Sequence, residues 1–146
     1  LQPGAADLEP GGCNQVLQTL TLMNNKIGAE GAKPLAAALA PRQSSDGTWH
    51  CNQALQTLNL EENSIGAEGA KALAAALAPR QGSDGTWHCN QALQTLSLGN
   101  NEIGAEGAKA LAAALAPRQG SDGTWHCNQT TRSELREPNR WRLHWP

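Results

Sequence analysis

The chain has 146 residues, of which 39% are hydrophobic and 3% aromatic, and it contains neither Phe nor Tyr. Any core must therefore be built from Leu, Ala and Ile. The formal net charge of -2 gives no electrostatic drive toward nucleic acid or an anionic membrane. No apolar stretch approaches the roughly 20 residues that span a bilayer. We therefore expect neither nucleic acid nor a membrane as a partner.

Residues 1–12 carry no periodic pattern, and we expect them to be an irregular N-terminal remnant. The chain opens on Leu1 and has no basic-then-apolar leader of the kind that directs secretion. These two features suggest a segment of a longer, cytoplasmic protein. Four cysteines in 146 residues are too sparse for a disulfide scaffold.

A repeat of 38 residues organises the rest of the chain, because Cys13, Cys51, Cys89 and Cys127 follow one another at that interval. It defines three units, 13–50, 51–88 and 89–126. The second and third units differ at only four places, which indicates recent duplication. Identity between units is therefore weak evidence of constraint, and the differences are more informative.

The first half of each unit reads L-x-x-L-x-L-x-x-N-x-I, starting at residues 17, 55 and 93. L-x-L is typical of a short strand, whose alternate side chains point to opposite faces. In the first unit, Leu20 and Leu22 are predicted to face the core and Thr21 to face outward. The Asn follows where the chain turns. Its buried amide is expected to bond backbone groups of its own repeat and of the neighbouring repeat. This predicts a structural ladder of Asn25, Asn63 and Asn101.

The second half of each unit predicts a helix. Apolar residues recur at i, i+3, i+4 and i+7, and Ala is the strongest helix former. A Pro after each helix is a stop signal. Pro34 conflicts with the first helix unless it lies in the first turn, so we expect that helix to begin near Gly31. The three apolar stripes are Ala32, Leu35, Ala36 and Leu39, then Ala70, Leu73, Ala74 and Leu77, then Ala108, Leu111, Ala112 and Leu115.

Between helix and next strand, Pro, Gly, Ser and Asp predict a loop, and it ends in Trp-His-Cys at 49–51, 87–89 and 125–127. Stacking would gather His and Cys, which are ligands that zinc favours, yet no C-x-x-C is present. A disulfide between repeats would need an oxidising compartment. The simplest interpretation is that Trp folds the loop onto the stack and Cys packs as a small apolar group. We predict no metal and no other cofactor.

Residues 127–146 break the pattern, because the three expected Leu positions hold Thr131, Glu134 and Arg136. We expect a degenerate fourth repeat or an unrelated basic tail rather than a normal polar capping repeat. Three repeats are near the minimum for stability. Both ends of the stack would then expose apolar core unless something covers them.

The pattern LQTLNLEENSIGAEGAKALAAALA resembles the ribonuclease-inhibitor type of leucine-rich repeat. That type also occurs in NOD-like innate immune receptors and in Ran GTPase-activating proteins. The resemblance implies an α/β fold, a right-handed leucine-rich-repeat solenoid forming part of a horseshoe. It also implies recognition of a macromolecule on the concave, strand-lined face. These units are longer than the family's repeats of up to about 29 residues.

The differences between units point to the same face. Within the eleven-residue motif they occur only at outward positions, although helices and loops also have surface. We therefore predict that these positions bind a protein ligand. Three strands offer roughly 200–300 Å² by strand spacing, against about 800 Å² for a standard interface, so three repeats alone should bind weakly. The predicted face consists of Thr21, Met23, Asn24, Lys26, Asn59, Glu61, Glu62, Ser64, Ser97, Gly99, Asn100 and Glu102.

The functional hypothesis is a protein-binding module from a larger NOD-like-receptor-like protein involved in innate immunity. One alternative is a structural, recently expanded array without a dedicated ligand. Another is a GTPase-activating-protein-like repeat domain, which rests on the family resemblance alone. We do not expect an enzyme, because the chain contains no Gly-rich phosphate loop and G-A-E-G-A-K lacks the Walker spacing.

Overall fold

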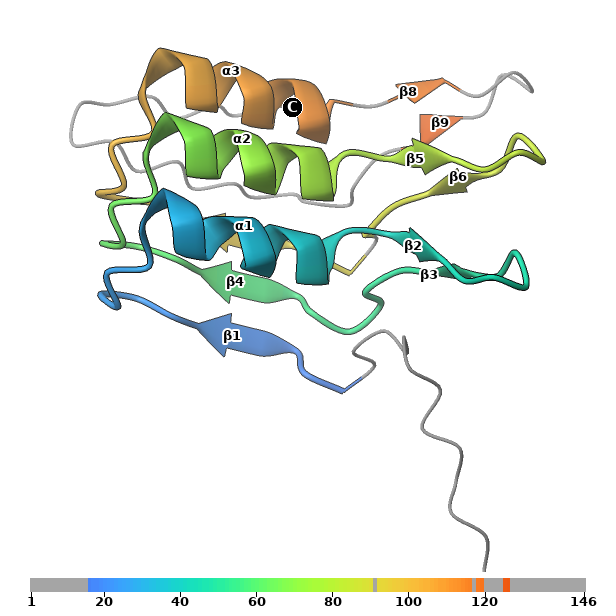
Figure 1. The fold of residues 1–146 in the computed structure, drawn as a ribbon, viewed down its shortest axis with the longest axis horizontal. Coiled ribbons are helices and arrows are strands. Elements are labelled where there is room, and N and C mark those ends of the chain that lie inside the picture. The colour runs from blue at the N-terminus through green and yellow to red at the C-terminus, as the bar shows by residue number, and fades with distance from the viewer. Residues whose placement is uncertain (1–15, 91, 117, 120–124, 127–146) are drawn as a thin grey trace, which may run out of the picture.

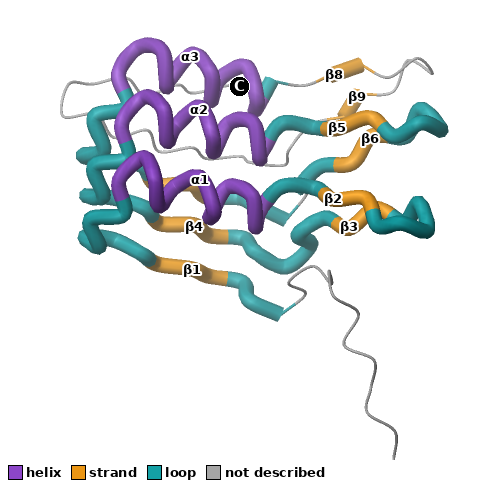
Figure 2. The backbone as a smooth tube through the Cα atoms, in the orientation of Figure 1, coloured by secondary structure: helices purple, strands orange, loops and turns teal. Residues whose placement is uncertain are grey.

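The computed structural model describes residues 16–90, 92–116, 118–119 and 125–126, and for residues 118–119 and 125–126 it describes the backbone alone. Three repeats stack on one another, and each consists of a strand, a helix and a short hairpin (Figures 1 and 2). The strands form one layer and the helices another, and the hairpins project beyond the C-terminal ends of the helices. The described residues therefore form a solenoid of strand–helix units, as the sequence predicts.

The strands form one parallel sheet in the order β1-β4-β7. Leu20 lies opposite Leu58, and Leu58 opposite Leu96, so the register repeats with the unit. Leu58 and Leu60 are both 0% exposed. This confirms the prediction that the two Leu residues of L-x-L face the core. The strands are β1 (Thr19–Thr21), β4 (Thr57–Asn59) and β7 (Thr95–Ser97).

Each helix is 12 residues long and ends two residues before a Pro. The residue before each Pro is extended, with ψ of 142° at Ala40, because a Pro ring excludes helical geometry from the residue before it. The predicted stop signals are therefore confirmed. No helix in the described part of the chain is both long and apolar enough to cross a membrane. The helices are α1 (Gly28–Leu39), α2 (Gly66–Leu77) and α3 (Gly104–Leu115).

The predicted start of the first helix near Gly31 is wrong. α1 begins at Gly28, as α2 and α3 begin at the equivalent glycines, so Pro34 is an interior residue. The backbone N–H of Gly31 already donates to Ile27 O at 3.1 Å. The Gly28 N–H donates to Asn63 O of the next repeat at 2.8 Å. The local cost of Pro34 therefore does not move the start of the helix, which falls at the same glycine in all three repeats.

The predicted loop after each helix is instead a small antiparallel hairpin. In the first one, Ser44 and Thr48 flank the turn, and Gly47 has φ of +87°. The side chain of Asp46 accepts the Thr48 N–H at 2.8 Å, as Asp does in tight turns. Asp-Gly between short extended segments is a hairpin signal that the loop prediction overlooked. The hairpins pair β2 (Arg42–Gln43) with β3 (Trp49–His50), β5 (Arg80–Gln81) with β6 (Trp87–His88), and β8 (Arg118–Gln119) with β9 (Trp125–His126).

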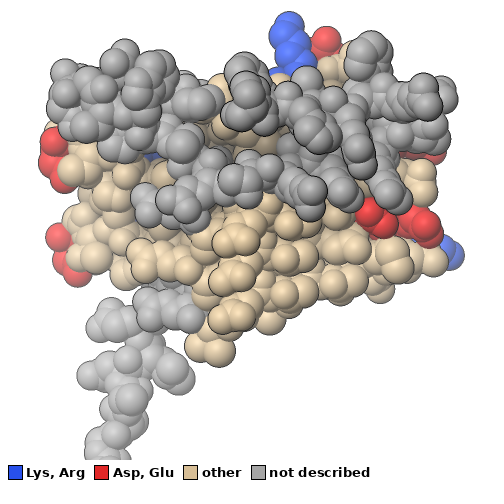
Figure 3. All heavy atoms as spheres, turned by 180° about the vertical axis from the view of Figure 1, so that it is seen from behind, with Lys and Arg blue, Asp and Glu red and all other residues tan. Residues whose placement is uncertain are grey.

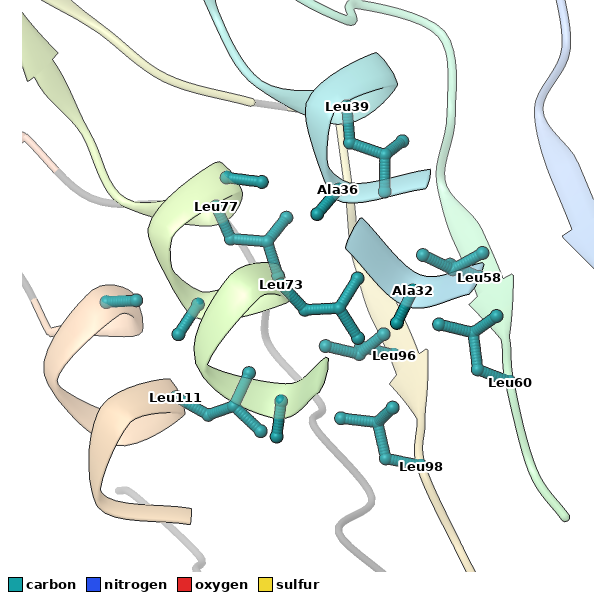
Figure 4. Packing of buried hydrophobic residues seen from close by; sticks show 14 of the residues in the cluster. Ala32, Ala36, Leu39, Leu58, Leu60, Leu73, Leu77, Leu96, Leu98 and Leu111 are labelled. Atoms are coloured by element: carbon teal, nitrogen blue, oxygen red, sulfur yellow. The ribbon is translucent and has the colours of Figure 1, made fainter. Parts of the chain in front are cut away.

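The core lies between the sheet and the helices and consists of Leu, Ile and Ala. Figure 4 shows the side chain of Leu73 of α2 pointing toward Ala32 of α1 and Leu96 of β7. All four predicted stripe residues of α2 are buried, whereas Ala112 at the matching place in α3 is exposed. The central repeat therefore buries both flanks of its helix, and the outer repeats bury one.

The three turns between strand and helix contain six non-glycine residues with positive φ, two in each turn. Each turn ends at a glycine. Gly66 has φ of +66°, and nothing lies within 4 Å of the place that a Cβ would take. We expect Gly66→Ala to lower the free energy of unfolding by about 1–2 kcal/mol, because a Cβ strains the left-handed backbone. Chemical denaturation checks this. Ala67→Gly at the next helix position is the control, and an equal loss there would contradict the backbone explanation.

Candidate interaction face

The outward side of the sheet presents small polar side chains. Thr21 is exposed, and Asn59 and Ser97 are half-buried, at the C-terminal ends of β1, β4 and β7. Two residues further on, Met23 is 47% exposed. Glu61 is half-buried there, and the matching Gly99 is buried. Six of the twelve predicted residues thus follow the strands and form what we call the strand face.

The other six predicted residues lie in the strand-to-helix turns, at the edge of the strand face. All are exposed, and all have left-handed backbone with φ between +53° and +57°. Because of this backbone conformation, these six residues do not continue the alternation of the strands. They form a separate row, which we call the turn row. It consists of Asn24 and Lys26, Glu62 and Ser64, and Asn100 and Glu102.

Sequence differences between units could not reveal three further residues of the strand face. Thr19, Thr57 and Thr95 occupy the same side of their strands as Thr21, Asn59 and Ser97. Thr19 is exposed, and the other two are half-buried. They are identical in all units, so a search for variation passes over them. The alternation of the strand would have found them, since outward positions recur every second residue.

The charges on this side of the molecule are unevenly placed. The strand face and turn row together contain Glu61, Glu62 and Glu102 against a single cation, Lys26. Figure 3, seen from behind, shows acidic side chains at both lateral edges of the molecule and uncharged residues over the described part of the lower middle. A partner with a basic edge and a polar centre therefore complements this side.

Hydrogen bonds of Asn63 and Asn101 support the turns beneath the face. Asn63 is 0% exposed. Its Oδ1 accepts the Asn25 N–H of the preceding repeat at 2.9 Å, and its Nδ2 donates to Leu22 O at 2.8 Å. Asn101 accepts the Asn63 N–H at 2.9 Å in the same way. Adjacent turns are thereby tied together, and the residues of the turn row are held at a fixed spacing.

The hairpins form a second feature, outside the strand face. The rings of Trp49 and His88 stack, with centroids 4.4 Å apart and planes within 9°. The pKa of Asp46 is lowered to about 2, mainly by a hydrogen bond from the Ser44 hydroxyl and next by one from the Thr48 N–H. A hollow of about 140 Å³ opens beside the stacked rings, lined by Trp49, Cys51, Gln53, Trp87, His88 and Cys89.

At Trp49 the structure differs from the predicted role of Trp. Trp49 stacks on the next hairpin rather than closing its own loop onto the solenoid. Cys89 is 5% exposed, and Cys51 is half-buried. Among the described residues, no group of three or more His, Cys, Asp and Glu could hold a metal ion. The third trio, at 125–127, and the predicted fourth unit, 127–146, lie outside the side chains that the structure describes.

A family model described as Leucine Rich repeat matches the chain three times, at residues 13–36, 51–74 and 89–112. Each match covers the strand, the asparagine turn and most of the helix. The chain contains three leucine-rich repeats. No curated protein and no solved structure matches the chain.

The leucine-rich repeats stop short of the hairpins, since each match ends inside a helix. The hairpin with its Trp–His stack is therefore an addition to the repeat that the family model describes. Leucine-rich repeats are generally protein-interaction modules and non-enzymatic binding scaffolds. This general role suits the strand face, whose exposed or half-buried Thr, Asn and Ser side chains can form hydrogen bonds with a protein partner.

Proposed function

We propose that the strand face and turn row of this leucine-rich-repeat protein bind another protein, as part of a larger cytoplasmic receptor of the NOD-like or ribonuclease-inhibitor kind. One observation carries the proposal. The outward residues of the parallel sheet at Thr21, Asn59 and Ser97 are polar and exposed or half-buried, while the inward Leu residues of β4 and β7 are buried. The differences between repeats fall largely on those outward positions, so each repeat offers its own set of contacts.

The proposed partner has a basic edge, because Glu61, Glu62 and Glu102 dominate the charge of the face. Glu61 carries the most weight in this proposal. Its side chain is half-buried, and its N–H is fixed by the Asn59 side chain at 3.0 Å. A partly buried carboxylate pairs with a cation more strongly than a fully exposed one. The small area of three strands points to weak affinity unless the full protein contributes more repeats.

The test is a charge reversal, Glu61→Lys with Glu62→Lys, measured by surface plasmon resonance against a protein selected for binding to the wild-type chain. We expect binding to be lost, since like charges across an interface cost several kcal/mol. Glu68→Lys with Glu106→Lys makes the same change in net charge on the helix layer and is the control. Unchanged affinity in the Glu61/Glu62 variant would refute the proposal.

A second candidate is a structural array without a dedicated ligand, and the near-identity of the units favours it. The two functions differ in what further repeats of the full-length gene should contain. A binding protein should vary at the strand face and turn row from repeat to repeat. A structural array should instead repeat the same residues, such as Asn59, Glu61, Glu62 and Ser64, in nearly every unit.

A further inference from the structure

Each helix of the stack has two different flanks, and the outer repeats show which neighbour covers each one. α1 buries Ala32, Ala36 and Leu39, the flank turned toward α2. α3 buries Gly107, Leu111 and Ala114, the flank turned back toward α2. We call the first kind the trailing flank and the second the leading flank. α2 buries both: Ala70, Ala74 and Leu77 on the trailing flank, and Gly69, Leu73 and Ala76 on the leading flank.

The fit between the two flanks depends on glycine. A Cβ on Gly69 would lie 3.1 Å from the Ala32 Cβ, and one on Gly107 would lie 2.9 Å from the Ala70 Cβ. The helices therefore approach until Gly on one touches Ala on the other. Gly31, the matching residue of α1, meets only side-chain atoms of Ile27 in its own repeat. Its flank is built for a neighbour, and none of the described residues supplies one.

The same pair of flanks is left uncovered at the two ends of the described stack. On α1, Ala38 is exposed, although its counterparts Ala76 and Ala114 are 4% and 5% exposed. On α3, Ala112 is exposed, although its counterparts Ala36 and Ala74 are 3% and 4% exposed. The uncovered trailing flank of α3 thus has the same residue types as the trailing flanks of α1 and α2, each of which packs against a leading flank within the chain. The leading flank of α1 is Gly31, Leu35 and Ala38, and the trailing flank of α3 is Ala108, Ala112 and Leu115.

Hydrogen bonding at the ends is complementary as well. Asn63 and Asn101 each donate to a carbonyl of the preceding repeat, Leu22 O at 2.8 Å and Leu60 O at 2.7 Å. The Asn25 amide donates within its own repeat, to the carbonyls of Leu22 and Met23. A preceding repeat with the same geometry would offer it Leu98 O. β1 and β7 likewise leave one edge each of the three-stranded sheet without a strand partner among the described residues.

Charged residues on the helix layer also interact across the junctions between repeats. The pKa of Lys33 is raised, first by its hydrogen bond to Glu30 and also by the charge of Glu68 in the next repeat. The pKa of Lys71 is also raised, first by its hydrogen bond to Glu68 and further by the charge of Glu106 in the next repeat. At the end of the stack, Lys109 is the residue that would face Glu30 of a following repeat. The two ends therefore carry opposite charges at matching places.

From these matching ends we infer that the chain associates head to tail with a second copy of itself, the trailing flank of α3 in one copy receiving the leading flank of α1 in the next. The contact continues the packing between α1 and α2 and between α2 and α3. It joins β7 of one copy to β1 of the next with the register unchanged. Because the two surfaces differ, the contact is heterologous and can continue from copy to copy. It does not involve the strand face and is independent of the proposed ligand.

Sedimentation velocity of the full chain over a range of concentration tests this. The mass of the wild type is expected to rise beyond two copies. Ala112→Arg and Ala38→Arg each place a charge at a contact and should each sediment as a monomer. Ala113→Arg and Ala37→Arg are matched controls, because these neighbours are exposed in every repeat, and they should associate like the wild type.

Mixing the two blocked variants tests the polarity of the contact. Ala112→Arg retains a free α1 end and Ala38→Arg a free α3 end, so an equimolar mixture should give a dimer that grows no further. A monomeric wild type would overturn the inference. So would a mixture that stays monomeric, or an Ala112→Arg variant that melts at a lower temperature without changing the mass, since residues of the same chain would then cover that flank.

The hairpin gives one further expectation. A Cβ on Gly82 would lie 3.0 Å from Nε1 of Trp49 in the preceding repeat. The first repeat has Ser44 at that position, so the same approach between copies is crowded there. Ser44→Gly should therefore lower the dissociation constant of the assembly by about tenfold, the equivalent of about 1.4 kcal/mol. A weaker assembly would contradict the register.

Discussion

Asn63→Ala is expected to lower the free energy of unfolding by about 3–5 kcal/mol, the largest loss among the changes considered. The Asn63 side chain accepts two backbone N–H groups, those of Asn25 and Ile27, and donates to three backbone carbonyls. Alanine leaves several of these groups buried without partners, and each such group costs about 1–3 kcal/mol. Domains have only about 5–15 kcal/mol of stability, so thermal and urea unfolding should show the effect clearly.

Asn25→Ala is the matched control for Asn63→Ala. The same residue in the first repeat is exposed and donates only to Leu22 O and Met23 O of its own turn. Its removal should cost about 1 kcal/mol or less, because Leu22 O keeps its hydrogen bond from Asn63 and water can reach Met23 O. Equal losses at the two positions would show that the contacts between repeats add nothing to the effect of the turn itself.

Pro34→Ala is expected to stabilise the protein by up to about 3 kcal/mol. Pro34 lies inside α1, where it cannot donate to Glu30 O and where its ring crowds that carbonyl. The second and third repeats hold Ala72 and Ala110 at this place, and Ala is the best helix former. The melting temperature should rise by on the order of 10 °C, which differential scanning calorimetry would detect.

The reciprocal change, Ala72→Pro, tests the same explanation in the central repeat. It should destabilise the protein by about 3 kcal/mol or more, because α2 packs on both neighbours and has less freedom to bend. A Pro34→Ala variant that melts no higher than the wild type would mean that α1 already accommodates the ring at no cost.

The strands, helices and helix ends could be predicted from sequence because each rests on a local signal. L-x-L fixes which Leu residues point inward, and the Pro after each helix fixes its end. The twelve residues of the predicted face were found by their variation, and the structure separates them into the strand face and the turn row. The binding role of both remains a prediction.

The features that could not be predicted depend on contacts between repeats. α1 starts at Gly28, where a hydrogen bond joins it to the next repeat, and no property of Pro34 reveals this start. The stacking of Trp49 on His88 joins residues of different units, so the sequence shows the two types but not their pairing. The positive φ of Glu62 and Ser64 contradicts their ordinary preference, and only the shape of the turn imposes it.

The identical register of neighbouring repeats has a consequence for how the protein can change in length. Thr19 pairs with Thr57, and Thr57 pairs with Thr95, so every junction between units is the same junction. Removing residues 51–88 as a block would bring the first and third units together on surfaces that already fit. Deletion of a single residue within a strand would instead turn the side chains that follow it in that strand to the opposite face. Loss or gain of a whole unit is thus the large mutation that this architecture tolerates best, and recombination between near-identical coding units supplies that mutation.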